Sequence, residues 1–305
     1  MKSITAAVAI GLLAHLAVAT NESRLHAQQT TVWAPKPAET PAYVSPQRPH
    51  VKLSELKARH RGQQEWRELL VDDGHLQAEY ISSPPGSTVS KRFHPDSRAW
   101  WVVVDGQMRV EIEGQAPFTA TKGSLVQVPK QTIYSMETIG GQPSLRFAVN
   151  ISNAKTLYPQ DVQPPTHARM NYLSLIFNRR AAPYENGNQP HVNLYEAAKA
   201  AKYTGGAFVR DEKASASIIY GYEKDLPPLD PTDRGHFHPE SPEFWLVMAG
   251  HIRYALENLD VFVAEEGDVA YVPASTYHLA RFYGPGPSSR LAITRFMNNS
   301  QVRER

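Results

Sequence analysis

One short stretch of the chain, RGHFHPESPEFWLVMAG at residues 234–250, contains residue types at the spacing of metal ligands. His236 and His238 lie two residues apart, and Glu243 follows five residues after the second histidine. Polar groups beside an apolar run are costly to bury unless a partner satisfies them, and a metal ion is one such partner. Imidazole and carboxylate ligands suit a divalent first-row metal.

Strands are the elements that could bring these side chains together. Residues i and i+2 of a strand point to the same face, so we expect His236 and His238 to share one side. Glu243 follows a short Pro-Glu-Ser-Pro loop, at the start of the next strand, and can return to the same interior. A fourth ligand must come from another strand, and His278 is the candidate, expected on the strand that follows the turn at Gly267.

The stretch has a counterpart earlier in the chain. HPDSRAWWVVVDGQMRVEIEG (94–114) matches HPESPEFWLVMAGHIRYALEN (238–258), with corresponding residues 144 positions apart. The same offset relates GSLVQVPKQTIY (123–134) to GDVAYVPASTYH (267–278), and RFAV (146–149) to RLAI (290–293). Upstream, PHVKLSELKA (49–58) matches PHVNLYEAAKA (190–200) at an offset of 141. Such regularity indicates a tandem duplication of a unit of roughly 100 residues.

Each unit consists mainly of predicted strands. WWVVVDGQMRVEIEG and FWLVMAGHIRYALE each contain an apolar run, a glycine turn and an alternating run. VFVAEEGDVAYVP predicts a further hairpin with its turn at residues 266–268. The predicted helices are Leu53 to Arg59 and Leu194 to Lys202, one in each unit. Many short strands joined by glycine and proline turns favour a small barrel or sandwich.

The spacing of His236, His238, Glu243 and Gly250, followed by that of Gly267, Pro273 and His278, resembles the two motifs of the cupin superfamily. The resemblance implies an all-β fold of two tandem jelly-roll β-barrel domains with short flanking helices, as in the bicupins. That group includes oxalate decarboxylases, ring-cleaving dioxygenases and seed storage globulins. It also implies the metal ligands, which are His236, His238, Glu243 and His278. Two positions depart from the usual second motif, because Ser275 stands where a glycine is common and Phe282 where an asparagine is common.

The first unit lacks most of this ligand set. At the positions matching the four ligands it has Arg92, His94, Ala99 and Tyr134. One histidine out of four ligands is too few for a metal, so we expect His94 to be a hydrogen-bonded core group and this domain to be structural. Binding of a small anion by Arg92 and Tyr134 stays open as an alternative.

The chain divides into five segments on this reading. Residues 1–27 resemble a Sec-type signal peptide with cleavage after Ala19 or Ala27, which predicts a periplasmic or secreted protein without a membrane anchor. Residues 28–48 form a proline-rich leader, expected to pack across the partner domain. The degenerate cupin domain spans 49–152, a linker spans 153–189, and the metal-binding cupin domain spans 190–298. The chain has no cysteine, which excludes disulfides and a lipoprotein anchor.

Composition and missing motifs exclude several classes of function. The net charge is +2, from 32 basic and 30 acidic residues without a Lys/Arg run, so no nucleic-acid partner is expected. No G-x-S-x-G, G-x-G-x-x-G or P-loop pattern occurs, which argues against serine hydrolase and nucleotide-dependent chemistry. The expected partner is a small-molecule substrate, and a homo-oligomer is compatible with the sequence.

One divalent metal ion per chain is therefore expected as cofactor, with manganese or iron ranked ahead of copper, nickel and zinc. Three imidazoles and one carboxylate leave two positions of an octahedron open for substrate.

The first hypothesis for the function is an oxidoreductase, dioxygenase-like, acting on a small chelating phenol, enol or diketone. The second is a non-redox decarboxylase, lyase or isomerase acting on an organic acid or sugar, with Glu240, Tyr222 or His191 as conceivable acid or base. The third is a binding or storage module without turnover.

Overall fold

The computed structural model describes residues 31–166, 168–200, 206–295 and 301–303, and a compact unit runs from Ala34 to Arg305. The predicted signal peptide lies outside the described residues. The elements are β1 (His50–Val51), α1 (Leu53–Arg59), β2 (Trp66–Asp72), β3 (Leu76–Ser83), β4 (Thr88–Arg92), β5 (Ala99–Asp105), β6 (Gln107–Ile112), β7 (Phe118–Thr121), β8 (Ser124–Val128), β9 (Tyr134–Ile139), β10 (Ser144–Ile151), β11 (His191–Asn193), α2 (Leu194–Ala200), β12 (Gly206–Arg210), β13 (Ser215–Tyr222), η1 (Glu223–Asp225), β14 (Glu243–Ala249), β15 (His251–Leu256), β16 (Phe262–Glu265), β17 (Val269–Val272), β18 (His278–Tyr283) and β19 (Pro287–Thr294).

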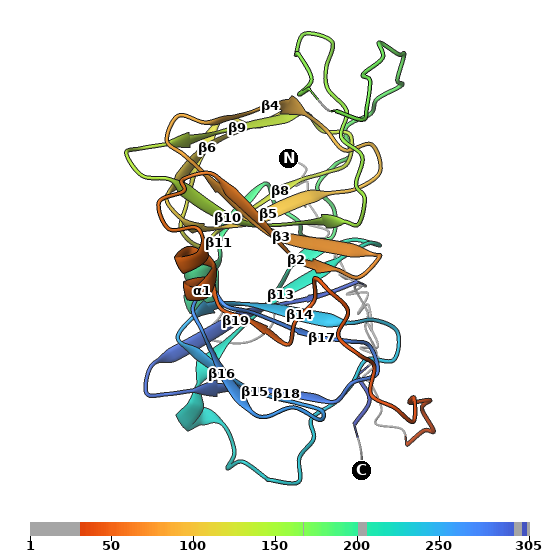
Figure 1. Ribbon diagram of the computed structural model, residues 1–305, viewed down its shortest axis with the longest axis vertical. Coiled ribbons are helices and arrows are strands. Elements are labelled where there is room, and N and C mark those ends of the chain that lie inside the picture. The colour runs from red at the N-terminus through yellow and green to blue at the C-terminus, as the bar shows by residue number, and fades with distance from the viewer. Residues whose placement is uncertain (1–30, 167, 201–205, 296–300, 304–305) are drawn as a thin grey trace, which may run out of the picture. The chain divides into compact units, whose positions relative to one another are not determined.

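These strands build two barrels, each made of two antiparallel sheets (Figure 1). In the first barrel a six-stranded sheet, ordered β11-β8-β5-β10-β3-β2, faces a four-stranded sheet, β4-β9-β6-β7. In the second, a six-stranded sheet, β1-β17-β14-β19-β13-β12, faces the three strands β16-β15-β18. The prediction of an all-β fold with two tandem jelly-roll barrels is confirmed.

The predicted hairpin at 266–268 is wrong, because the two strands it joins lie in different sheets. β16 pairs with β15, whereas β17 pairs with β14 and β1. Burial explains the assignment of strands to sheets. β14 is buried on both faces and needs a sheet that is covered on both sides, whereas β15 alternates buried and accessible residues and suits an outer sheet. Successive strands therefore cross from one layer to the other, as in a jelly roll.

The two six-stranded sheets share one apolar core between the barrels. Tyr80 and Phe147 of the first barrel belong to the same cluster as Phe244, Leu246 and Leu291 of the second, each at most 1% exposed. Two further clusters fill the barrel interiors. The burial of such large side chains in a shared interface couples the two repeats energetically.

The segments that precede the two barrels are exchanged between them. β1, which comes before the first barrel, pairs with β17 of the second, and β11, which comes before the second barrel, pairs with β8 of the first. Asp268 anchors the first of these arms. Its buried carboxylate accepts hydrogen bonds from the backbone N–H of Leu53 (3.0 Å) and is paired with His50 Nε2 (2.7 Å).

The leader also lies against the second barrel, as expected. Lys36 forms an ion pair with Glu257 at 3.0 Å, and Asn258 Nδ2 donates to Thr40 Oγ1 at 2.7 Å. Both short helices occur where the sequence predicts them. α2 is described to Ala200, and the last two residues predicted for it lie outside the described part.

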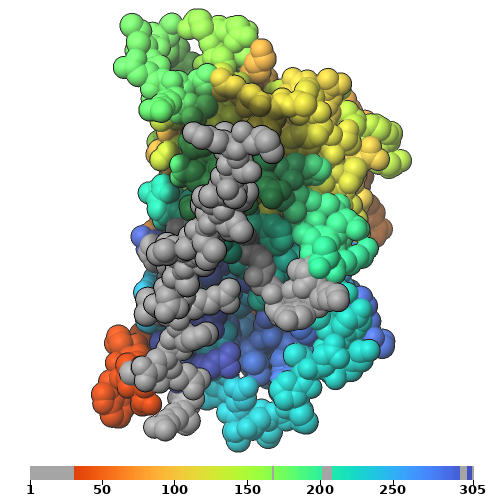
Figure 2. Space-filling model, turned by 180° about the vertical axis from the view of Figure 1, so that it is seen from behind, coloured from red at the N-terminus to blue at the C-terminus, as the bar shows by residue number. Residues whose placement is uncertain are grey.

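The linker after Asn153 packs against the first barrel, and Figure 2 shows its green segment beside the yellow strands of that barrel. Phe93 pairs with Leu157 in a backbone bridge, and Arg179 donates two hydrogen bonds to the carboxylate of Glu113. The exact domain boundaries stay a prediction. No helix among the described residues is long and apolar enough to cross a membrane.

Candidate metal centre

Backbone pairing brings two of the predicted ligands side by side. His236 N donates to His278 O at 3.1 Å, and His278 N donates to His236 O at 2.9 Å, which forms an isolated antiparallel bridge. Phe237, between the two histidines, pairs in the same way with Val302 near the C-terminus. His278 begins β18, one strand later than the sequence predicts.

Gly235 permits the close approach of these two segments. Its φ is +79°, and a Cβ added there would lie 2.0 Å from the carbonyl oxygen of His278. Glycine has no Cβ and adopts positive φ without steric cost, so it alone fits this position. The RGHFH sequence therefore places His236 in register with His278.

A second backbone contact fixes His238. Ser275 N donates to the carbonyl of His238 at 2.8 Å, and Ser275 itself adopts φ +60°. Gln131, the matching residue of the first barrel, adopts φ +61° and donates its N–H to His94 O at 2.7 Å. The left-handed conformation at both sites explains why glycine is common at this position of the cupin motif.

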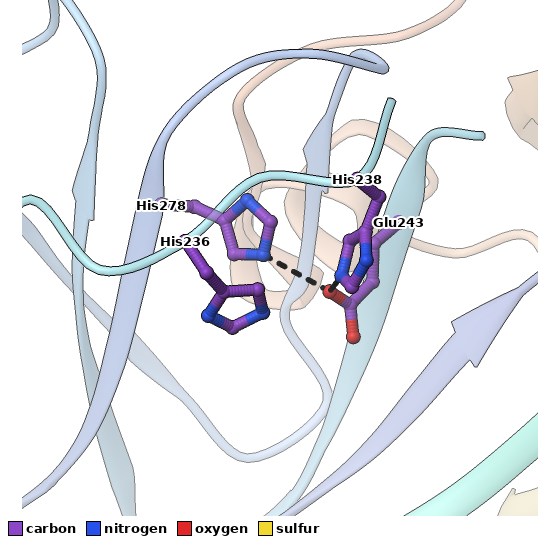
Figure 3. Close-up of side chains that lie close together, drawn as sticks. All are labelled: His236, His238, Glu243 and His278. Atoms are coloured by element: carbon purple, nitrogen blue, oxygen red, sulfur yellow. Dashed lines mark hydrogen bonds and ion pairs between the residues drawn. The ribbon is translucent and has the colours of Figure 1, made fainter. Parts of the chain in front are cut away.

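The four predicted ligands converge inside the second barrel, with one ligand atom from each within 4.8 Å of the others. Figure 3 shows the side chains of His236, His238, Glu243 and His278 turned toward a common point. Glu243 Oε2 lies 2.9 Å from His238 Nε2 and 3.1 Å from His278 Nε2. The ring of His236 is 4.9 Å from that of His238 and 4.4 Å from that of His278, measured between centroids.

His238 Nε2 donates to Glu243 Oε2 at 2.9 Å, whereas the hydrogen bonds of His278 and His236 leave each with a lone pair at this point. His278 Nδ1 lies 3.0 Å from the carbonyl oxygen of Thr276, and because a carbonyl only accepts, Nδ1 carries the proton. His278 Nε2 then directs its lone pair toward the Glu243 carboxylate, without a hydrogen bond. His236 Nδ1 is also buried without a hydrogen-bond partner. Converging acceptors of this kind repel one another unless a cation lies between them, so the residues fit a metal ion.

The protonation states favour the same conclusion. Burial and the neighbouring His278 lower the pKa of His236 to about 3, so its imidazole is neutral at neutral pH. Burial alone would raise the pKa of Glu243, but the hydrogen bond from His238 outweighs burial and holds that pKa below the usual range. A neutral imidazole and an ionised carboxylate are the forms that ligate metals.

The matching histidine of the first barrel is hydrogen-bonded, as expected, but it is half-buried rather than part of the core. His94 Nδ1 donates to Lys155 O at 2.8 Å, and its Nε2 accepts from the Tyr134 hydroxyl at 3.1 Å. Burial lowers the pKa of His94, which keeps the ring neutral. Arg92 lies over the ring of Tyr158, 5.4 Å from its centroid. Within the described part of the chain, the second-barrel cluster is the one group of at least three such side chains with ligand geometry.

The suggested acid and base residues do not gather at the centre. His191 is wrong as a candidate, because it stacks on Phe118 and lies 2.9 Å from Ser124 Oγ, both in the first barrel. Its segment forms the exchanged strand β11. Glu240 is exposed, and the hydroxyl of Tyr222 faces that of Tyr220 at 3.3 Å.

Sequence reasoning did not single out Arg290 on β19, which is half-buried opposite Val247 of β14 in the second barrel. The matched RFAV and RLAI segments contained the signal, since both place an arginine at the same strand position.

Comparisons with known proteins agree with this geometry. A family model described as "Cupin domain" matches residues 80–150 and 223–294, once in each barrel. No curated protein matches the chain. Among solved structures, a salicylate 1,2-dioxygenase from Pseudaminobacter salicylatoxidans is 13% identical with a TM-score of 0.59, over 83% of this chain and 87% of the other.

Two further solved structures share the fold. A cupin 2 conserved barrel domain protein from Leptotrichia buccalis is 13% identical, with a TM-score of 0.56 over 81% of this chain and 95% of that one. A single-residue variant of oxalate decarboxylase from Bacillus subtilis is 14% identical, with a TM-score of 0.50 over 91% of this chain and 88% of that one. At these identities the similarity concerns the fold. The two family matches and the paired jelly-roll barrels together show that the chain belongs to the cupin superfamily, as a two-domain bicupin.

Proposed function

We propose that this bicupin is a metal-dependent oxidoreductase, dioxygenase-like, that acts on a small chelating phenol, enol or diketone at the second barrel. One observation carries the proposal. Three imidazoles and one carboxylate converge inside the barrel, with the lone pair of His278 Nε2 aimed at an ionised Glu243. When bound, a divalent metal would supply Lewis-acid and electron-transfer chemistry at positions that the four side chains leave open.

The protein's own residues prepare the site in two ways. Backbone bonds fix the imidazoles, through the bridge between His236 and His278 and the contact from Ser275 to His238. Aromatic rings that are almost entirely buried pack beside the ligands inside the barrel. Trp245 lies 5.3 Å from the His278 ring and 5.2 Å from the Tyr254 ring, measured between centroids. Such walls favour a ligand with an apolar, planar body and a few oxygen atoms at one end.

The metal is proposed to be manganese or iron, and copper, nickel and zinc remain compatible with the same ligands. The fold is shared with a salicylate 1,2-dioxygenase and with an oxalate decarboxylase. Oxygen consumption separates the two kinds of chemistry, because a non-redox decarboxylase, lyase or isomerase consumes none.

The test is oxygen uptake by the purified protein, loaded in turn with each metal and supplied with catechols, enols and diketones. Substrate-dependent oxygen loss that disappears in His278→Ala and persists in His94→Ala would support the proposal. Turnover of an organic acid without oxygen loss would replace it by the non-redox hypothesis. Full metal occupancy without turnover of any compound would favour a binding module.

Export through the N-terminal segment is a further part of the proposal, and its support is the apolar stretch from Ile4 to Ala19 behind Lys2. Sequencing the N-terminus of the protein recovered from its native compartment tests it. A mature chain beginning at Thr20 or Gln28 is expected, and an intact N-terminus inside the cell would contradict export.

A further inference from the structure

The short segment that contains two of the candidate ligands, residues 236–238, is paired along both of its edges. On one edge His236 exchanges two backbone hydrogen bonds with His278. On the other edge Phe237 N donates to Val302 O at 2.9 Å, and Val302 N donates to Phe237 O at 3.0 Å. Neighbouring residues of a strand direct their backbone groups to opposite edges, so residues 236–238 are placed like a central strand. Residues 301–303, called here the closing segment, form the outer edge.

The first barrel contains the same contact. Phe93 corresponds to Phe237 at the offset of 144, and Leu157 corresponds to Val302 at an offset of 145. Phe93 N donates to Leu157 O at 3.0 Å, and Leu157 N donates to Phe93 O at 2.9 Å. A bridge that recurs at the same position of both repeats belongs to the duplicated unit. The pairing of Val302 is therefore a feature of the fold rather than a chance contact of the last residues.

The bridge also determines which side chains lie next to the ligands. In an antiparallel pair the residues that flank the bridged pair face each other, on the side opposite to the bridged side chains. The first barrel shows this geometry. Tyr158 follows the bridging leucine, Arg92 precedes the bridging phenylalanine, and the guanidinium lies 5.4 Å from the centroid of the tyrosine ring. The flanking residues of the closing segment should accordingly lie beside the histidines.

The register places Arg303 beside His236, on the face that the ligands occupy. Gln301 is placed beside His238 in the same way. Burial is the largest cause of the lowered pKa of His236, and the charge of Arg303 contributes in the same direction, which agrees with this proximity. The closing segment thus lies next to the ligand cluster.

The closing segment also lies where the cluster is nearest to solvent. His236 is partly accessible, whereas the other three ligands are each at most 8% exposed. Gln301 and Arg303 are exposed, and Val302 between them is half-buried. Displacement of the closing segment would therefore free the most accessible ligand and remove the outer support of the segment on which it lies.

We propose that the closing segment completes the metal centre, with Val302 as a positioning residue that acts through its backbone. By holding Phe237 on its outer edge, Val302 fixes the two histidines that flank this residue and slows the loss of a bound ion. The assignment rests on the metal site of the proposed function and explains how the chain retains the ion there. Since the contact is made by backbone groups, the side chain at position 302 should matter little.

The experiment uses the full chain loaded with zinc and follows the transfer of zinc to an excess of a chromogenic chelator. Val302→Pro removes the N–H that donates to Phe237, and proline is compatible with extended backbone at a sheet edge. Val302→Ala keeps that N–H and shortens the side chain. Leu157→Pro is the matched control, because it removes the corresponding N–H from the first barrel. The thermal midpoint of each metal-free protein is measured in parallel.

Val302→Pro should accelerate zinc release by about fivefold, the effect of losing one backbone hydrogen bond. A chain shortened after Ser300 should release zinc at least as fast. Val302→Ala and Leu157→Pro should both release zinc at the wild-type rate, even if Leu157→Pro lowers the thermal midpoint as much as Val302→Pro does. Release at the wild-type rate from Val302→Pro and the shortened chain, or equal acceleration by Leu157→Pro, would overturn the assignment.

Failure of the metal site is distinguishable from failure of this assignment. If the wild-type protein takes up no zinc, the proposed function falls, and the closing segment is tested by hydrogen exchange of the metal-free protein. Val302→Pro should then speed amide exchange around Phe237 and not around Phe93, and Leu157→Pro should do the reverse. That pattern would keep the positioning role of Val302, and unchanged exchange around Phe237 in Val302→Pro would overturn it.

Discussion

Glu243 determines the electrostatics of the candidate centre at the scale of single residues. It is the sole carboxylate among the four converging side chains, and it contacts two imidazoles through one oxygen. The spacing of the motifs was enough to predict these four residues, because metal ligation constrains residue type as well as position. The half-buried position of Arg290 could not be predicted in the same way, since an arginine at the start of an apolar run normally faces water.

Replacing Glu243 by glutamine should lower metal affinity by at least about tenfold, because the amide keeps the shape but loses the charge. Competition with a chromogenic chelator measures the affinity. His94→Gln, in the first barrel, serves as the control and should leave affinity unchanged. Equal affinities of the Glu243→Gln and wild-type proteins would mean that the carboxylate does not bind the ion.

Ser275 offers a test of backbone strain beside the centre. Ser275 adopts φ +60°, so replacing it by glycine relieves left-handed backbone strain, although glycine also gives the unfolded chain more conformational freedom. Because the first effect is larger, Ser275→Gly should raise the free energy of unfolding by about 0.5–1 kcal/mol. Denaturant unfolding measures this difference. Gln131→Gly removes the same strain but also the side-chain bonds of Gln131 to Pro95 and Arg180, so a smaller gain or a loss is expected there. A destabilised Ser275→Gly protein would contradict this account.

At the scale of elements, the centre depends on how irregular segments pair rather than on complete strands. The strands, the glycine turns and both helices were predictable from periodicity and turn residues. The pairing of β16 with β15 instead of β17 was not, because a tight turn joins two strands equally well within one sheet or between two. His278 was expected one strand too early because β17 ends at Val272, and the segment from Pro273 to Tyr277 separates it from β18.

Gly235 tests the pairing of His236 with His278. Gly235→Ala should lose most of its bound metal and destabilise the protein by more than about 1 kcal/mol, because the added Cβ meets the His278 carbonyl. Gly74→Ala is a matched control, since Gly74 has φ +81° but nothing within 4 Å of an added Cβ. The Gly74→Ala protein should lose only the stability that the strained backbone costs, and it should keep its bound metal. Normal metal content in Gly235→Ala would disprove the role of this contact.

At the scale of the whole molecule, the two barrels form one energetic unit. They share a core, and each contributes an arm to a sheet of the other. The repeated PHV segments were visible in the sequence, but which sheet each joins could not be predicted, since pairing between distant strands depends on tertiary packing. The degenerate barrel thereby supports the one that contains the ligand cluster.

Calorimetry should accordingly show a single unfolding transition. Removal of the metal by a chelator should lower the midpoint of the entire transition, because an ion at 100 times its dissociation constant stabilises the native state by about 2.7 kcal/mol. Two separate transitions, of which only one responds to the chelator, would show that the barrels unfold independently.

The central claim is that His236, His238, Glu243 and His278 hold a metal ion. The most direct measurement is elemental analysis of the protein purified without chelators or affinity nickel, with His278→Ala and His94→Ala prepared alongside. The account predicts about one metal ion per chain in the wild-type and His94→Ala proteins and far less in His278→Ala. A wild-type protein without metal, or a His278→Ala protein with undiminished metal, would contradict it.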